Sequence, residues 1–223
     1  SGTQILEAFI IGYEINVRAG AAITLKKDIH PHGSWGLIGG GYALGKLNNY
    51  TSEEYDSMLA LTSSLPFISL WNPIFEGEQI RDLMIGLNNL HLLLLPAMVN
   101  SGISSSQKNL ETIYSSILGN SVDHTKLAEG IGERFDLMSS YFKFHPFCRF
   151  CHSPMEGVKQ LIEEEQISID SIKKITINTY EAAARLNHCD PVNEYAGKFS
   201  IPYAVSKFLQ KEFGKTIESS QIE

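Results

Sequence analysis

The chain has 223 residues, of which 43% are apolar and 19% charged, and its formal net charge is −7 at pH 7. This composition excludes wholesale disorder and provides core material for one large domain or one and a half ordinary ones. The negative charge argues against nucleic acid or an anionic membrane as a partner. It leaves a small anionic metabolite open, because a few local cations dominate within a Debye length of about 8 Å.

The cysteine content and the apolar segments bear on the compartment. Three cysteines are too few, and odd in number, for a disulfide framework, so we expect a reducing cytoplasm. No basic segment followed by an apolar one opens the sequence, as a secretory signal would. The most apolar run, Leu90 to Val99, is far shorter than the roughly 20 residues of a membrane span and contains His91 and Pro96, which predicts a core helix.

Helical periodicity predicts that about the first 130 residues form helices packed on helices. Thr51 and Glu54 form the pattern of a capping box at the start of one of them. Six expected helices cover residues 3–23, 34–47, 51–65, 78–99, 104–118 and 122–134. The second is rich in glycine, which is tolerated where neighbouring helices approach closely. Because helical spacing begins at the first residues, we expect a fragment of a longer chain.

The character of the sequence changes near residue 140. Pro154 is expected to open a helix that runs to residue 165, and Pro202 lies in the first turn of a helix over residues 200–213. Between them, β-branched residues alternate with polar ones over residues 172–180, which predicts a half-buried strand. The sequence therefore predicts a mainly α chain: an all-helical bundle domain over residues 1–139, followed by a smaller α+β domain over residues 140–223.

Two motifs have only the outline of a known site. The GxxxxGK pattern from Gly40 to Lys46 is followed by Leu47 in place of the serine or threonine that a phosphate loop needs, and no strand precedes it. A packing role for its glycines is the simpler interpretation. The CxxCH pattern from Cys148 to His152 could attach haem or offer ligands to zinc, but no export signal and no fourth zinc ligand accompany it.

A third group of residues is dispersed over the expected junctions between elements. His30 and His32 join two helices, Arg81 lies near the start of the long apolar helix, and Lys143 and His145 open the second domain. Each alone is more often exposed or paired than catalytic. Together they place cations and titratable groups at junctions, where clefts between domains form.

Four motifs carry a resemblance to a known family. Residues 12–14 are similar to its GYE element, 30–36 to its HPTGxxG loop, 143–154 to its KxYPxCRxxHPxxD stretch and 198–205 to its KFSLPYAVA motif. They follow one another in the family's order and span nearly the whole chain. The chain thus resembles the 2-methylcitrate dehydratase (MmgE/PrpD) family, as a fragment that lacks the family's N-terminal part and C-terminal end.

The resemblance implies a helical domain with a smaller α+β lid, a homodimer, a small carboxylic-acid substrate, and neither a cofactor nor an obligatory metal. Reactions in the family include dehydration of 2-methylcitrate, decarboxylation of cis-aconitate and epimerisation of iminodisuccinate. Each moves a proton or a carboxyl group at the carbon next to a carboxylate. This chemistry needs a positioned acid or base, with cations that hold the carboxylates and stabilise the developing charge.

The motifs of the resemblance also imply roles for individual residues. His30 matches the loop histidine, a candidate catalytic acid or base. Lys143 matches the lysine that leads the lid motif and is the second candidate catalytic residue. Arg81 aligns with a substrate-binding lysine, which it replaces with a planar fork. Cys148 and His152 lie on the lid motif as candidate substrate-binding residues.

Two departures from the family pattern, at Arg81 and at Met84, and one gap upstream keep other functions open. Met84 stands where the family often has a histidine, and the family's active-site aspartate and second histidine come from a segment upstream of residue 1. The leading expectation is a metal-independent lyase for a di- or tricarboxylic acid. The alternatives are an epimerase of an amino-dicarboxylate and a catalytically inactive remnant that only binds.

Overall fold

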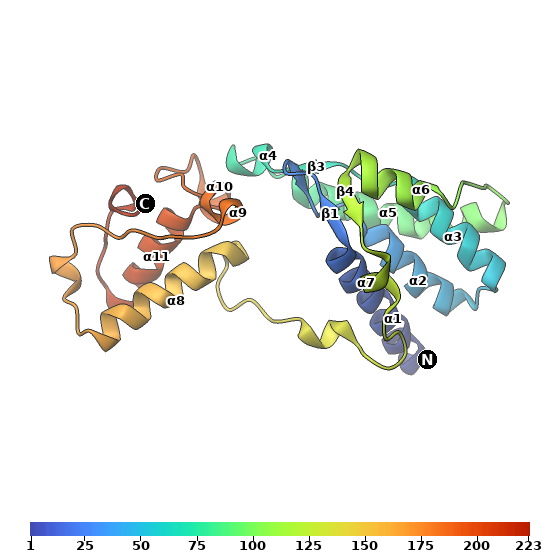
Figure 1. Cartoon of the computed structure of the whole chain (residues 1–223), viewed down its shortest axis with the longest axis horizontal. Helices are drawn as coiled ribbons and strands as arrows, with labels where there is room; N and C mark the ends of the chain where they lie inside the picture. The colour runs from blue at the N-terminus through green and yellow to red at the C-terminus, as the bar shows by residue number, and fades with distance from the viewer. The chain divides into compact units, whose positions relative to one another are not determined.

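The computed structural model describes residues 1–223, and the chain divides into two compact units (Figure 1). Unit 1 consists of Ser1–Trp71 and Ile80–Tyr141, and unit 2 of Asn72–Gln79 and Phe142–Glu223. Helices account for 60% of the residues and strands for 6%, which confirms the mainly α fold class. Asn72–Gln79 was placed in the first domain by the sequence but groups with unit 2.

Unit 1 begins with three helices, all of which were predicted: α1 (Gly2–Ala22), α2 (Gly36–Asn48) and α3 (Ser52–Ser64). The capping box is present, since the Thr51 hydroxyl accepts from the Glu54 N–H and the Glu54 carboxylate accepts from the Thr51 N–H. The helices α1 and α2 pack closely through glycine. A Cβ atom on Gly39 would lie 2.3 Å from the carbonyl oxygen of Gly12, so only glycine allows this approach.

Short strands and further helices complete unit 1. Strand β1 pairs antiparallel with β4, and β2 pairs antiparallel with β3 so that His30 lies opposite Ser69. The bounds are β1 (Ile23–Leu25), β2 (Ile29–His30), β3 (Ser69–Leu70), α5 (Ile80–Asn100), α6 (Asn109–Thr112) with the π-helical turn Ile113–Ile117, β4 (Gly119–Val122), α7 (His124–Ala128) and the 3-10 turn Asp136–Ser139. The helices expected over 104–118 and 122–134 are thus much shorter than predicted.

The glutamate of the GYE element is structural. Glu14 is buried on α1 and pairs with Arg18 one turn later, with 2.6 Å between Oε1 and Nε. Its carboxylate also accepts from the N–H groups of Asp136 and Leu137. The Arg18 guanidinium donates to the carbonyl oxygens of Glu129 and Arg134. The pair therefore fastens α1 to the segment of residues 129–137, more than 100 positions away in sequence.

The long helix α5 is not the buried helix that was predicted. Only three of its residues, Asn88, Leu95 and Val99, are buried. Leu93 is 77% exposed, and Leu83 is 54% exposed. By length and composition α5 could cross a membrane, but a single such helix is weak evidence, because core helices of soluble proteins pass the same test. The cytoplasmic location and the absence of a membrane partner stay predictions.

Unit 2 is built on two helices, α8 (Arg149–Glu164) and α11 (Ile201–Phe213), which pack against each other. α8 starts five residues before the expected Pro154, which lies inside it. α11 agrees with the prediction, and Ser200 caps it by accepting from the Tyr203 N–H. The shorter elements are α4 (Asn72–Phe75), the 3-10 turn Ile169–Ser171, α9 (Glu181–Ala184), α10 (Glu194–Gly197) and the 3-10 turn Ser219–Gln221.

The strand expected over residues 172–180 does not form, since only Ile175 in this segment takes part in a β-bridge. The segment is extended, and Ile172, Ile175 and Ile177 are partly buried, as the alternating pattern indicated. Its ladder partner, however, is only the last few residues of unit 2. A single parallel bridge joins Ile175 to Ile222. The backbone hydrogen bonds between this segment and residues 221–223 are too few to define a strand.

Candidate functional site

His30 lies on β2 in unit 1 and is buried, with 4% of its surface exposed. Its Nδ1 atom accepts a hydrogen bond from the backbone N–H of His32, at 3.1 Å. The rings of Trp71 and His32 meet it edge-on, with centroids at 4.4 and 4.5 Å. Gly33, with φ of +88°, turns the loop that follows. The loop thus holds the imidazole in one orientation.

Burial, together with the charges of His32 and Arg81, lowers the pKa of His30 to about 3. The ring is therefore neutral at pH 7. Because Nδ1 accepts a hydrogen bond from a backbone N–H, the single ring proton must reside on Nε2. His30 can consequently donate a proton or a hydrogen bond through Nε2, whereas neither ring nitrogen is available as a base in this tautomer.

Arg81 lies close enough to His30 for its positive charge to lower the pKa of the histidine. It lies in the first turn of α5, and its side chain is 18% exposed. The guanidinium binds the neighbouring carboxylate of Asp82 through Nε at 2.9 Å and Nη2 at 2.6 Å. Both donors converge on one carboxylate oxygen, Asp82 Oδ1, so the guanidinium is already arranged on the kind of group that arginine binds well.

Buried polar groups that the sequence did not single out lie near His30. Asn88 and His91 follow Arg81 by seven and ten residues, and therefore lie on the same face of α5. Asn88 approaches Gly36, and His91 packs on Phe67 with ring centroids at 4.7 Å. The spacing from Arg81 could have found both residues. Buried atoms without a hydrogen-bond partner in this region are Ser34 Oγ, Ser69 Oγ, Asn88 Oδ1 and His91 Nδ1.

Such atoms are uncommon, because burying a polar atom without a partner costs about 1–3 kcal/mol. They lie on the loop after β2, on β3 and on α5, the elements that surround His30. This part of unit 1 is therefore equipped to hydrogen-bond water or a polar ligand. It also has a neutral imidazole and a guanidinium.

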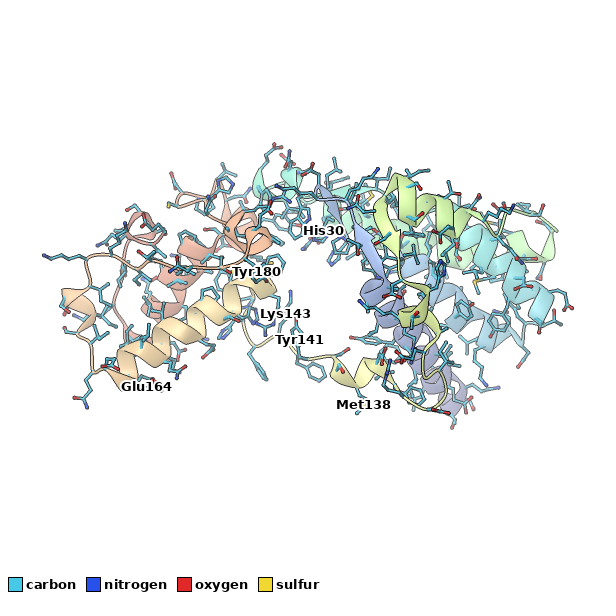
Figure 2. The ribbon with its side chains drawn as sticks, viewed as in Figure 1. His30, Met138, Tyr141, Lys143, Glu164 and Tyr180 are labelled. Carbon is cyan, nitrogen blue, oxygen red and sulfur yellow. The ribbon has the colours of Figure 1, made fainter.

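The remaining predicted residues lie at the start of α8 in unit 2. Figure 2 shows Lys143 on the extended segment that leads into this helix. Lys143 is exposed, and its positive charge acts on both Cys151 and His152. Cys148 is the N-cap residue of α8. Lys143, Cys148 and His152 therefore gather at one end of one helix.

Two histidines face each other in this cluster. The rings of His145 and His152 have centroids 5.1 Å apart, and His145 Nε2 lies 2.7 Å from a carboxylate oxygen of Glu156. Burial lowers the pKa of His152; the carbonyl of Phe147, 3.2 Å from its Nε2, opposes this effect only in part. No three His, Cys, Asp or Glu side chains gather as a metal site would require. The zinc interpretation of the CxxCH motif therefore has no supporting geometry.

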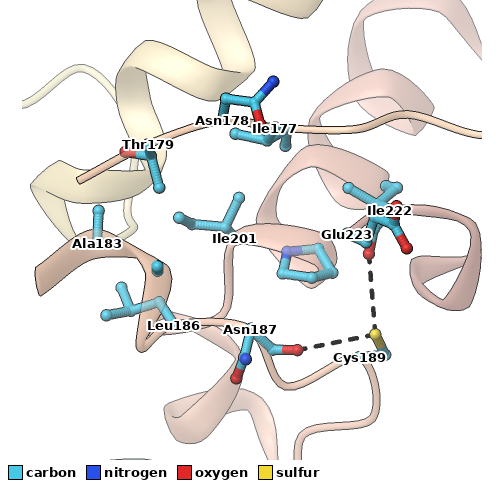
Figure 3. A pocket seen from close by; sticks show the side chains of 12 residues that line it. Ile177, Asn178, Thr179, Ala183, Leu186, Asn187, Cys189, Ile201, Ile222 and Glu223 are labelled. Atoms are coloured by element: carbon cyan, nitrogen blue, oxygen red, sulfur yellow. Dashed lines mark hydrogen bonds between the residues drawn. The ribbon is translucent and has the colours of Figure 1, made fainter. Parts of the chain in front are cut away.

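A cavity of about 410 Å³ lies elsewhere in unit 2 (Figure 3). Its walls come from the extended segment 177–179, from α9 and the loop after it, from the start of α11 and from residues 222–223. The Cys189 thiol lies on this wall and donates to the carbonyl oxygens of Asn187 and Ile222, at 3.8 Å each. None of the five predicted site residues lines it, so the cavity is separate from the clusters above.

The fold and these clusters define a mainly helical protein that groups cations with imidazoles, in unit 1 at His30 and in unit 2 at the start of α8. Residues 145–216 match the family model of the MmgE/PrpD C-terminal domain. The match runs from His145 through α8 and α11, and includes Cys148 and His152. This match is consistent with a fragment of an MmgE/PrpD family protein, as the motifs predicted. A comparison with curated proteins gave no significant match.

Proposed function

We propose that the chain is part of a metal-independent lyase of the MmgE/PrpD type, which dehydrates or decarboxylates a small di- or tricarboxylic acid. The observation that carries this proposal is the family match over residues 145–216, which includes the Cys148–His152 cluster. The His30–Arg81 pair of unit 1 supports it with complementary chemistry. The family is known to include dehydratases. The homodimer and the cytoplasmic location that the resemblance implies stay predictions.

In this proposal the cations bind the carboxylates of the substrate. Arg81 exchanges the carboxylate of Asp82 for one of the ligand. Lys143 has an exposed ammonium and can meet a second carboxylate without losing a buried partner. Cys148 and His152 line the same end of α8. Cations at these positions stabilise the enolate-like charge that develops next to a carboxylate.

His30 acts as the acid, because its proton is on Nε2 and its Nδ1 is held by a backbone N–H. In dehydration it protonates the departing hydroxyl group; in decarboxylation it protonates the carbon that loses the carboxyl group. A neutral imidazole that donates through Nε2 is an effective electrophile next to a carbonyl or carboxylate. The base that removes a carbon-bound proton is expected from the family's upstream segment.

The second candidate, an epimerase of an amino-dicarboxylate, is favoured by Met84. This residue approaches Gly33 in the His30 loop, since a Cβ atom on Gly33 would lie 3.3 Å from the Met84 Cβ. An imidazole that the family often has is therefore replaced by an apolar side chain beside His30. The loss of this imidazole would suit a substrate that does not need its hydrogen bond, such as an amino-dicarboxylate held differently from a citrate-like acid. The third candidate is a chain that binds an acid without transforming it.

The test is an assay of the full gene product with 2-methylcitrate, citrate and cis-aconitate, followed by the absorbance of unsaturated acid. We expect turnover of one acid, and a loss of at least about tenfold in kcat/KM for Arg81→Ala and for Lys143→Ala. Lys126→Ala, an exposed lysine on α7, is the matched control. Proton exchange on an amino-dicarboxylate without lyase turnover would favour the epimerase. The absence of both turnover and binding with all of these acids would contradict the proposal.

A further inference from the structure

Two cysteines stand three residues apart at the start of α8. Cys148 is the N-cap residue and is partly exposed, whereas Cys151 in the first turn is completely buried. They are not disulfide-bonded to each other or to Cys189. The helix that follows them is 16 residues long and packs on α11, so the two thiols are presented by a rigid element.

The backbone spacing at the start of α8 is compatible with a bridge between the two cysteines. The N–H of Cys151 donates to the carbonyl oxygen of Cys148 at 2.9 Å, which closes the first turn. Three residues of a helical turn separate Cα atoms by about 5 Å, and a disulfide spans roughly 4.4–6.8 Å between Cα atoms. The N–H of Cys148 also donates to the carbonyl oxygen of Lys198 at 2.7 Å, which fixes the helix start. A bond between the two sulfur atoms therefore needs side-chain rotation but no refolding.

The two thiols differ in the way that dithiol–disulfide exchange requires. Burial raises the pKa of the Cys151 thiol, and the nearby Cys148 raises it further while Lys143 opposes the effect. The Cys151 thiol therefore stays protonated until a base close to it takes the proton. Cys148 is the thiol that an external reagent can reach. It stands at the N-cap of α8, where the helix dipole favours negative charge.

We propose that Cys148 and Cys151 form a reversible redox couple that exchanges with small-molecule disulfides such as glutathione disulfide. The Cys148 thiolate attacks one sulfur of the disulfide, forms a mixed disulfide and releases one thiolate. That thiolate takes the proton of Cys151, whose sulfur then attacks the Cys148 sulfur and expels the second thiolate. The second thiolate takes up the proton that Cys148 gave to solvent. Two protein thiols are oxidised to one disulfide, and one external disulfide is reduced to two thiols.

The exchange is independent of the proposed lyase activity, because it is measured on the sulfur atoms alone. The reduced full chain is equilibrated with glutathione buffers of increasing oxidised fraction. Remaining thiols are then labelled with a maleimide under denaturing conditions and counted by intact mass. We expect three labels in the reduced chain and one, on Cys189, in the oxidised chain. Three labels in every buffer, or a bridge that includes Cys189, would overturn the proposal.

Three variants assign the steps. Cys189→Ser should leave the Cys148–Cys151 bridge unchanged and serves as the matched control. Cys151→Ala should accumulate a mixed disulfide with glutathione on Cys148, because the resolving sulfur is missing. Cys148→Ser, at the partly exposed position, should abolish the reaction while circular dichroism stays that of the parent. Bridging or glutathione adducts that persist on Cys151 in Cys148→Ser would overturn the assignment of the attacking sulfur.

Discussion

His30 determines how unit 1 responds to acid. Its folded pKa of about 3 lies below the ordinary value of 6.5, so below pH 6.5 the unfolded chain binds more protons at this residue than the folded chain does. Stability therefore falls as the pH drops from 6.5 toward 3. The slope from one such residue is at most about 1.4 kcal/mol per pH unit.

This sign gives a prediction for His30→Asn, which cannot titrate. The free energy of unfolding of the variant should depend less on pH between about pH 6 and 4 than that of the parent. Both tryptophans, Trp35 and Trp71, lie in unit 1, so urea unfolding followed by their fluorescence reports on that unit. His124→Asn, at an exposed histidine, should keep the parent slope. Equal slopes for His30→Asn and the parent would contradict the buried neutral imidazole.

Glu14 also loses its contribution to stability in acid, but at a lower pH. Burial would raise its pKa, but hydrogen bonds from the backbone of Leu137 and Asp136 and from Arg18 outweigh this and lower it. A carboxyl group with a lowered folded pKa contributes stability above its unfolded value, here 4.5. That stability is lost as the pH falls through the folded pKa.

We predict that Glu14→Gln lowers the free energy of unfolding of unit 1 by about 3 kcal/mol at pH 7, because Arg18 is left buried without its counter-charge. The matched control is Glu7→Gln on the same helix. Glu7 and Lys46 form a solvent-exposed pair, and exposed pairs contribute roughly 0–1 kcal/mol. Urea unfolding at pH 7 measures both. A loss at Glu14 no larger than that at Glu7 would remove the structural role assigned to the pair.

Contacts between residues close in sequence could be predicted, whereas contacts between residues far apart in sequence could not. The i,i+4 pairing of Glu14 with Arg18 follows from helical spacing alone. Their bonds to residues 129–137 could not be foreseen, because no local pattern encodes a partner more than 100 positions away. His30 and Arg81 were singled out separately, and the structure brings them together. Asn88 was missed because an asparagine in an apolar helix is usually a solvent-exposed polar residue, whereas this one is buried.

At the scale of elements, the glycines of α2 are contact residues and the glycine of α5 is not. A Cβ atom on Gly39 would collide with backbone and side-chain atoms of α1, whereas one on Gly86 would meet nothing within 4 Å. A substitution of alanine for glycine should therefore affect stability in opposite directions at Gly39 on α2 and at Gly86 on α5.

We predict that Gly39→Ala destabilises unit 1, because α1 and α2 must separate to admit the methyl group. Gly86→Ala should stabilise it by up to about 1 kcal/mol, through the higher helix propensity of alanine. Thermal unfolding followed by tryptophan fluorescence compares the two. A lowered midpoint for Gly86→Ala together with an unchanged one for Gly39→Ala would contradict the packing of these helices.

Helix existence was predictable where caps and periodicity agreed, as for α1, α3 and α11. Burial was less predictable. The residues of α5 are apolar, but apolarity does not say which neighbour covers a side chain, and most of its leucines are exposed. The strand over 172–180 failed for a related reason. An alternating pattern favours a strand, but residues 172–180 pair only with the short segment around Ile222, which does not extend the ladder beyond one bridge.

At the scale of the whole molecule, the sequence placed a change of character near residue 140, but it contained no signal for Asn72–Gln79. This segment joins unit 2 through contacts that span more than 100 residues. Asn193 Nδ2 donates to the carbonyl oxygen of Gly77, and the Arg185 guanidinium lies 5.7 Å from the Phe75 ring centroid. Long-range contacts of this kind leave no periodic trace.

The central proposal is that His30 and Arg81 of unit 1 bind a small carboxylic acid. A crystal structure of the protein with bound citrate tests it most directly. We predict that Arg81 binds a carboxylate of citrate at about 3 Å, with His30 Nε2 donating to the same molecule. Citrate bound away from both residues, or His30 and Arg81 more than about 15 Å apart, would contradict the proposal, because a small acid in a pocket of ordinary size could not bridge them.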